Sequence, residues 1–168
     1  MHAILTGAPI RISARRDLRC CRGRIVATRG TPVHAATFIR RRIIVLDADL
    51  LESDVELRRI LIHELFHFVW VRLANPVRRS FEQLLTVETG VRGELGWSAE
   101  YRKRDLAARD LRQRSRKWRE YCCESFCDTA AYVYARCKQH DEFTLPPRHR
   151  AKRIAWFGKN LGAGNVRI

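Results

Sequence analysis

The residues best suited to chemistry lie in a short apolar segment, LIHELFHFVWV at positions 61–71, whose only polar side chains are His63, Glu64 and His67. Burying such groups without partners is costly, so the fold should offset that cost. On a helix, the two histidines lie one turn apart on the same face, with the glutamate beside them. Two imidazoles so spaced can share a tetrahedral metal ion, while the glutamate reaches a water on that metal. The segment therefore predicts one Zn²⁺ per chain with Glu64 as general base. The alternative is a pair of core histidines with satisfied hydrogen bonds and a glutamate that has found a cation.

A catalytic zinc site needs a third protein ligand and an open position for water. Residues 68–73 contain no Gly or His, so the third ligand must come from a distant segment. Glu124 is the leading candidate, because Glu124 and Asp128 lie one turn apart on an otherwise apolar helix of small residues. Asp128 would hold the free ring nitrogen of a ligand histidine. Alternatively, this carboxylate pair binds two of the many arginines. The other candidate ligands are Glu82, Glu88, Glu94, His140 and His149.

Composition places the chain among globular proteins. It has 168 residues, 46% of them hydrophobic and 30% charged, which fits one compact domain with a real core. The longest apolar stretch is too short, and too interrupted by His and Glu, to span a bilayer. The N-terminal residues do not form a typical secretory signal. We therefore expect a single domain over 1–168, in the cytoplasm, without a transmembrane segment.

The net charge is strongly positive. Lys and Arg number 33 against 18 Asp and Glu, a formal charge of +15. Such an excess can attract nucleic acid, an acidic protein or an anionic membrane, or it can simply reflect an arginine-rich composition. The basic segments about 101–119 and 148–159 could carry a nucleic-acid-binding module with a structural zinc. Against that interpretation, the sequence has no recognised reader motif and no aromatic residues interleaved with the basic ones.

Six cysteines are present, and none forms a CxxC pair or matches a zinc ribbon or a small disulfide scaffold. They are Cys20, Cys21, Cys122, Cys123, Cys127 and Cys137. In a reducing compartment most would be packing residues with free thiols. Cys123 and Cys127 lie close enough to Glu124 in sequence to engage the metal when oxidised or rearranged.

The N-terminal part predicts a small, mainly antiparallel sheet in about residues 1–50. Short β-branched runs are punctuated by Gly and Pro, with Arg40, Arg41 and Arg42 at a candidate hairpin tip. These runs are 10–13, 24–28, 33–39 and 43–46.

Helices are predicted for the rest of the chain. Ser53 and Glu56 form a capping-box pattern that opens a helix over 53–75, and this helix is apolar nearly all round and therefore central. The other segments are a helix over 76–89, a basic helix over about 98–118, a helix over 119–138 that is continuous with it or broken near Arg119, a basic helix over 148–158, and a tail over 158–168.

A family resemblance rests on two short motifs. His63-Glu64-Leu65-Phe66-His67 together with Glu124-Ser125-Phe126-Cys127-Asp128 resembles the gluzincin class of zinc metallopeptidases, in which an HExxH helix is followed by a Glu-x-x-x-Asp helix. The small size and sheet-first order look most like the minimal cytoplasmic peptidases of the ImmA/IrrE type. The long basic insertion between the motifs departs from the short gluzincin pattern. The resemblance implies an α+β, zincin-like fold and hydrolysis of peptide bonds in a protein substrate.

The resemblance also implies roles for individual residues. His63, His67 and Glu124 would bind zinc, Glu64 would accept a proton from the attacking water and pass it to the leaving amine, and Asp128 would support a histidine. A tyrosine or histidine often stabilises the oxyanion in such sites, and the candidates are Tyr121, Tyr132, Tyr134 and His140. An extended substrate would pair with the strand near 33–39 or 43–46.

A second enzyme class is open at this point. SprT-like proteases, which act on DNA-bound proteins, share the HExxH pattern but use a third histidine. In that interpretation His140 or His149 would replace Glu124 as the metal ligand.

Overall fold

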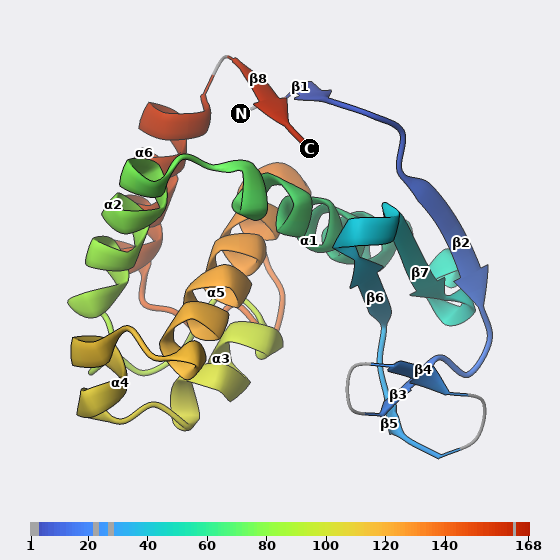
Figure 1. The fold of residues 1–168 in the computed structure, drawn as a ribbon, viewed down its shortest axis with the longest axis horizontal. Coiled ribbons are helices and arrows are strands. Elements are labelled where there is room, and N and C mark those ends of the chain that lie inside the picture. The colour runs from blue at the N-terminus through green and yellow to red at the C-terminus, as the bar shows by residue number, and fades with distance from the viewer. Residues whose placement is uncertain (1–3, 22–23, 27–28, 163) are drawn as a thin grey trace.

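The computed structural model describes residues 4–21, 24–26, 29–162 and 164–168, and has an α+β architecture (Figure 1). Within these residues six helices follow a strand-rich N-terminal part. The helices are α1 (Asp54–Arg72), α2 (Asn75–Thr86), α3 (Trp97–Arg104), α4 (Ala108–Gln113), α5 (Arg116–Tyr134) and α6 (Pro147–Leu161). The strands are β1 (Ile4–Thr6), β2 (Arg11–Arg15), β3 (Arg19–Cys21), β4 (Arg24–Val26), β5 (Thr31–Pro32), β6 (Ala35–Phe38), β7 (Ile43–Asp47) and β8 (Asn165–Arg167).

The strands form three small sheets rather than the single, mainly antiparallel sheet expected. Their orders are β2-β7-β6, β4-β3-β5 and β1-β8. β6 and β7 are antiparallel and joined through residues 39–42, as the predicted hairpin requires, but β2 runs parallel to β7 and β1 runs parallel to β8. β8 lies in the segment expected to be a tail. Both differences arise because β-branched runs mark strands without specifying distant partners. Residues 27–28 of the predicted run 24–28 lie outside the described residues.

Helix α1 forms as its sequence predicts. The Ser53 side chain accepts a hydrogen bond from the Glu56 amide at 3.4 Å, which caps the first turn. The helix ends at Arg72, and the backbones of Leu73 and Ala74 then leave helical geometry, with ψ of 138° and 147°. The bounds therefore confirm the predicted helix over 53–75 to within a few residues.

The predicted basic helix over 98–118 is broken into α3, α4 and the start of α5. Arg114 adopts a left-handed backbone conformation, with φ of 45°, and Ser115 then caps α5 by accepting a hydrogen bond from the Trp118 amide at 3.3 Å. Asp110 favours this break, because its carboxylate accepts hydrogen bonds from the Ala107 amide at 2.9 Å and from the Ser115 hydroxyl at 2.7 Å. The two breaks thus fall at residues 105–107 and 114–115, and none falls near Arg119.

The core lies where α5 packs against α1, with α3 on another side of α5 (Figure 1). Aromatic rings fill this contact: Phe126 from α5 lies 5.0 Å from Trp70 of α1 and 5.1 Å from Phe157 of α6, centroid to centroid. A second apolar cluster joins the other side of α1 to the sheet through Phe68 and Ile44. Helix α1 is therefore central, and the α5 face that meets it carries Glu124 and Asp128.

Among the described residues, no helix combines the length and apolar character that a bilayer span requires.

Candidate metal centre

Three predicted ligand atoms meet between α1 and α5. The Nε2 atoms of His63 and His67 lie 3.2 Å apart, and Oε2 of Glu124 lies 3.3 Å from the first and 3.8 Å from the second. Helical spacing places the two histidines on one face of α1. Glu124 is 57 positions after His67 in the sequence (124 − 67), and the packing of α5 on α1 brings it to the histidines.

These distances fit a tetrahedral metal site. With zinc–nitrogen and zinc–oxygen bonds near 2.0–2.1 Å, two ligand atoms of a tetrahedron lie about 3.3 Å apart. The His63–His67 and His63–Glu124 distances are within about 0.1 Å of that value, and the His67–Glu124 distance of 3.8 Å needs only a small approach. The residues present therefore fit a metal ion, and imidazole with carboxylate is a donor set that zinc accepts.

Asp128 supports the first histidine, as predicted. Its Oδ1 atom lies 2.7 Å from Nδ1 of His63, and its Oδ2 atom accepts a hydrogen bond from the Ala99 amide at 2.9 Å. Because the carboxylate engages Nδ1, it leaves Nε2 to face Glu124. Gly96 lies against the same carboxylate, and a Cβ there would lie 2.3 Å from its carbon atom.

Glu64 is held by a strand residue that the sequence did not identify. The Thr37 hydroxyl, on β6, donates a hydrogen bond of 2.5 Å to Oε2 of Glu64. Glu64 is buried, with 8% of its surface exposed, so this bond offsets part of its desolvation. The connection between a β6 threonine and an α1 glutamate depends on tertiary packing, and no local sequence pattern indicates it.

The charged groups of the centre shift the pKa values of His63, His67 and Glu124. Burial alone would lower the pKa of His63, but the charge and hydrogen bond of Asp128 raise it well above the usual value. Burial likewise lowers the pKa of His67, yet its bond to Cys123 and the nearby Glu124 charge raise it to about 9. Burial would raise the pKa of Glu124, and the two histidines and Arg102 outweigh it, lowering that pKa to about 2. The histidines and Glu124 therefore shift one another's pKa values in opposite directions.

Two cysteines of α5 also border the centre. Cys123 Sγ lies 3.4 Å from Nδ1 of His67, whereas Cys127 belongs, with His63 and His67, to a group whose ligand atoms all lie within 4.8 Å of one another. That group could hold a metal ion. Oε2 of Glu124 lies within the same limit of both Nε2 atoms, at 3.3 Å and 3.8 Å. Glu124 and Cys127 are three positions apart on one helix, and this spacing alone indicates that their side chains lie on the same face.

The other predicted ligands lie elsewhere, bound to other partners. Glu82 binds Arg114, and Glu88 and Glu94 both bind the buried Arg153. His140 binds Glu56 at 2.9 Å, and His149 binds Glu88 at 3.2 Å. The structure brings none of these five side chains into the group formed by His63, His67 and Glu124.

The predicted oxyanion stabilisers are likewise engaged away from the histidines. The Tyr121 hydroxyl donates to Glu94 at 2.6 Å, Tyr132 packs edge-on against Phe143, and Tyr134 stacks on Phe66. His140 is occupied by Glu56, as above. In the part of the chain that the structure describes, no hydrogen bond links any of these four residues to His63, His67 or Glu124. The charge of Arg102, on α3, acts on Glu124 and helps to lower its pKa.

Five of the nine Lys and Arg side chains in the basic segment 101–119 form ion pairs within the fold. Several of its cations form ion pairs with carboxylates: Arg102 and Arg116 with Glu120, Lys103 with Glu94, Arg104 with Glu100, and Arg114 with Glu82. Paired cations contribute little to attracting a polyanion. This finding weakens the prediction of a nucleic-acid surface on that segment.

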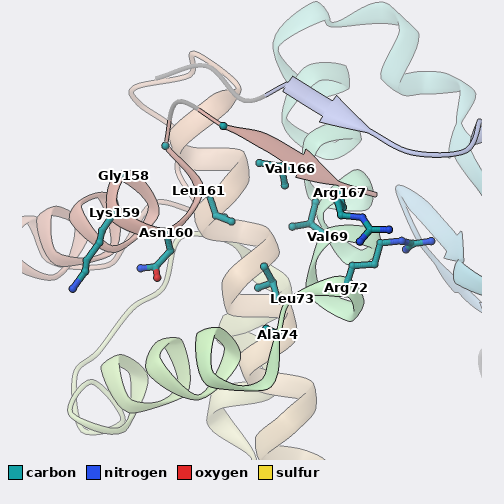
Figure 2. Close-up of a pocket in the computed structure, with 12 residues that line it drawn as sticks. Val69, Arg72, Leu73, Ala74, Gly158, Lys159, Asn160, Leu161, Val166 and Arg167 are labelled. Atoms are coloured by element: carbon teal, nitrogen blue, oxygen red, sulfur yellow. The ribbon is translucent and has the colours of Figure 1, made fainter.

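Unpaired positive charge also gathers at the C-terminal end of α1. Figure 2 shows Arg72 and Arg167 side by side at the edge of a cavity of about 450 Å³. Slight burial together with the charges of Arg42 and Arg167 lowers the pKa of Arg72. Within the described residues no carboxylate pairs with these three arginines. The cavity is lined by none of the metal-centre residues, so it is a separate feature.

No family model, curated protein or solved structure matches this chain.

Proposed function

We propose that the protein is a zinc-dependent metallopeptidase that hydrolyses peptide bonds in a protein substrate. The observation that carries the proposal is the spacing of three donor atoms from His63, His67 and Glu124, at 3.2 Å, 3.3 Å and 3.8 Å. A structural zinc site is usually closed by four protein ligands, whereas a catalytic one keeps three and an open position. The adjacent Glu64 supplies a base beside that position, as gluzincins require.

Each residue of the centre has its own role in the proposed hydrolysis. A metal ion in this centre supplies a Lewis acid that polarises a carbonyl and lowers the pKa of a bound water. Glu64 takes a proton from the attacking water and later delivers it to the leaving amine. Thr37 fixes the orientation of the Glu64 carboxylate, and Asp128 fixes the ring of His63 through Nδ1.

The substrate would bind along β6. In the order β2-β7-β6 this strand is at the edge of its sheet, while β7 is central and has both neighbours occupied. Of the two strands that the sequence offered, β6 is therefore the one that can accept an extended peptide by strand addition. Thr37 on the same strand contacts Glu64, so a peptide on β6 would pass beside the base. This arrangement supports a zincin-like organisation of sheet edge and catalytic helix.

The test combines metal content with hydrolysis. We expect elemental analysis to find one zinc per chain in the unmodified protein and in Glu64→Gln. The unmodified protein should cleave members of a peptide library prepared from a digested proteome, read by mass spectrometry, and Glu64→Gln should lose at least about a hundredfold in rate, the usual range for general-base catalysis. A folded protein without zinc, zinc without cleavage, or cleavage that survives Glu64→Gln would each overturn the proposal.

The geometry gives less support to the SprT-like alternative. It needs a third histidine at the metal, and both His140 and His149 are bound to glutamates of other regions. A direct check is His140→Ala and His149→Ala, which should each retain zinc, whereas His67→Ala should lose it.

A polyanion-binding role is a second candidate, favoured by the unpaired cluster Arg42, Arg72 and Arg167. It predicts binding to duplex DNA or RNA whose affinity falls steeply with salt. Arg72→Gln combined with Arg167→Gln should then weaken binding and reduce the salt slope, while Arg104→Gln combined with Arg116→Gln, in the paired segment, should change little. Equal effects of the two pairs would count against this location.

A further inference from the structure

We propose that the thiolate of Cys127 is a fourth protein donor to the same metal ion, which closes the centre in its resting state. This inference rests on the proposed function and concerns the regulation of that site. It starts from the position of Cys127, which follows Glu124 by three residues on α5 and therefore shares its face. The Cys127 side chain is fully buried, so its sulfur approaches the histidines from inside the protein.

The distances allow coordination after a small movement. Ligand atoms of His63, His67 and Cys127 all lie within 4.8 Å of one another. In a tetrahedral zinc site with a zinc–sulfur bond near 2.3 Å, sulfur and nitrogen donors lie about 3.6 Å apart. The separations of the sulfur from the two histidine nitrogens therefore need to shorten by at most about 1.2 Å each, which a rotation about the Cα–Cβ bond can supply.

Cys123 provides the contrast within the same helix. Its sulfur contacts Nδ1 of His67 at 3.4 Å, on the opposite side of the imidazole from Nε2. The metal would bind Nε2, which lies 3.2 Å from Nε2 of His63. Cys123 thus contacts His67 away from the metal position, whereas Cys127 belongs to the group of possible ligands with His63 and His67. The two thiols are chemically alike and differ in where they meet the histidines.

Coordination by sulfur would change the state of the centre. The Cys127 S–H bond breaks, its proton passes to solvent, and a metal–sulfur bond forms, as ligand deprotonation requires. Four protein donors then fill a tetrahedron and leave no position for water, which is the arrangement of structural zinc sites. The sulfur would leave when a substrate carbonyl takes its place, so a closed resting state is compatible with the hydrolysis expected of the unmodified protein. Glu124→Ala would also keep some metal, because His63, His67 and Cys127 remain.

Cobalt substitution tests the assignment. Co²⁺ is titrated into the metal-free full chain under reducing conditions, for the unmodified protein, Cys127→Ala and Cys123→Ala. We expect visible d–d bands in all three and a near-ultraviolet sulfur-to-cobalt charge-transfer band in the unmodified protein and Cys123→Ala only. The d–d bands without the charge-transfer band in the unmodified protein would overturn this inference and leave the metal centre standing. Loss of the band in Cys123→Ala alone would overturn it as well. No d–d bands at all would overturn the proposed function too.

A second measurement needs no variant, so it stays decisive if Cys127→Ala fails to fold. X-ray absorption at the zinc edge of the zinc-loaded unmodified protein should show one sulfur neighbour near 2.3 Å besides nitrogen and oxygen neighbours near 2.0–2.1 Å. A shell of nitrogen and oxygen alone would overturn the assignment of Cys127.

Discussion

The carboxylate of Asp128 joins two parts of the molecule, because Oδ1 lies 2.7 Å from Nδ1 of His63 while Oδ2 accepts the amide proton of Ala99 at 2.9 Å. One side chain of α5 therefore connects α1 to the start of α3. Its position depends on both contacts, so the orientation of the His63 ring depends on a helix that contributes no proposed ligand.

We expect Asp128→Ala to weaken metal binding by about 10- to 100-fold, the usual cost of removing a carboxylate that orients a ligand histidine. The His63 ring would lose the group that selects its Nε2 atom for the metal. Competition with a chromophoric chelator measures the effect. An unchanged affinity in a folded variant would contradict the role assigned to this carboxylate.

Gly96→Ala should produce a similar loss without touching any ligand. The added Cβ would lie 2.3 Å from the carboxylate carbon of Asp128 and displace it. The backbone at Gly96 is extended, with φ of 178°, so the effect would come from this contact and not from strain. Gly90→Ala is the matched control, because nothing lies within 4 Å of its added Cβ. Similar metal affinities for the two variants would show that the carboxylate tolerates displacement.

Thr37→Val should slow hydrolysis while zinc content stays at that of the unmodified protein. The variant keeps the shape of the side chain but removes the donor to Glu64. A hydrogen bond to a charged group is worth about 1.5–3 kcal/mol, so we expect kcat to fall at least tenfold with little change in KM. Thr31→Val, on β5, serves as the control for a strand threonine outside the centre. A loss confined to KM would place Thr37 in substrate binding instead.

Arg153→Met should destabilise the protein by about 3–5 kcal/mol, because it removes the cation that two buried carboxylates share and leaves Glu94 with Lys103 and Glu88 with His149. Arg153 is fully buried and lies 2.7 Å from Glu88 and 2.8 Å from Glu94. Urea unfolding measures the change. Lys152→Met, an exposed position on the same helix, should stay within about 0.5 kcal/mol of the unmodified protein. If both variants unfold at the same urea concentration, the buried network contributes little.

Stability should fall in acid. Burial would raise the pKa of Glu94, but Arg153 and Lys103 outweigh it and hold that pKa below its usual value of 4.5. A lowered folded pKa means that the unfolded chain binds the proton more tightly. The stabilisation is therefore complete above about pH 4.5 and disappears as the pH falls through the folded pKa. Urea unfolding between pH 7 and pH 3 checks this, and Glu94→Gln should have a flatter pH dependence.

The residues of the candidate metal centre were predictable because the information that indicates them is local. HELFH and the ESFCD segment each place two polar groups one turn apart on a helix, and both helices form where the pattern indicates. The contact between the two helices could be predicted only from the need of a zinc site for a third ligand. The packing of α5 on α1 then brought Glu124, rather than Glu82 or His140, to the histidines.

The pairing of the strands and the breaks in the basic helix were harder to predict from the sequence. β2 pairs with β7 across 32 positions (43 − 11), and no property of either strand selects a parallel partner at that separation. The break at Arg114 depends on the carboxylate of Asp110, which accepts from both Ala107 and Ser115. Thr37 was missed for a similar reason, because its partner is on another element.

The pairing of β1 with β8 has a consequence for the order of folding. Ile4 is in register with Asn165, a separation of 161 positions (165 − 4), and only three residues of each strand take part. Contacts so distant in sequence form late, since the loop that they close is long. On the ribosome, this pairing must wait until residues 165–167 have been synthesised. Among the described strands it is also the natural first place for local opening, and its amide protons should exchange with solvent faster than those of α1 and α5.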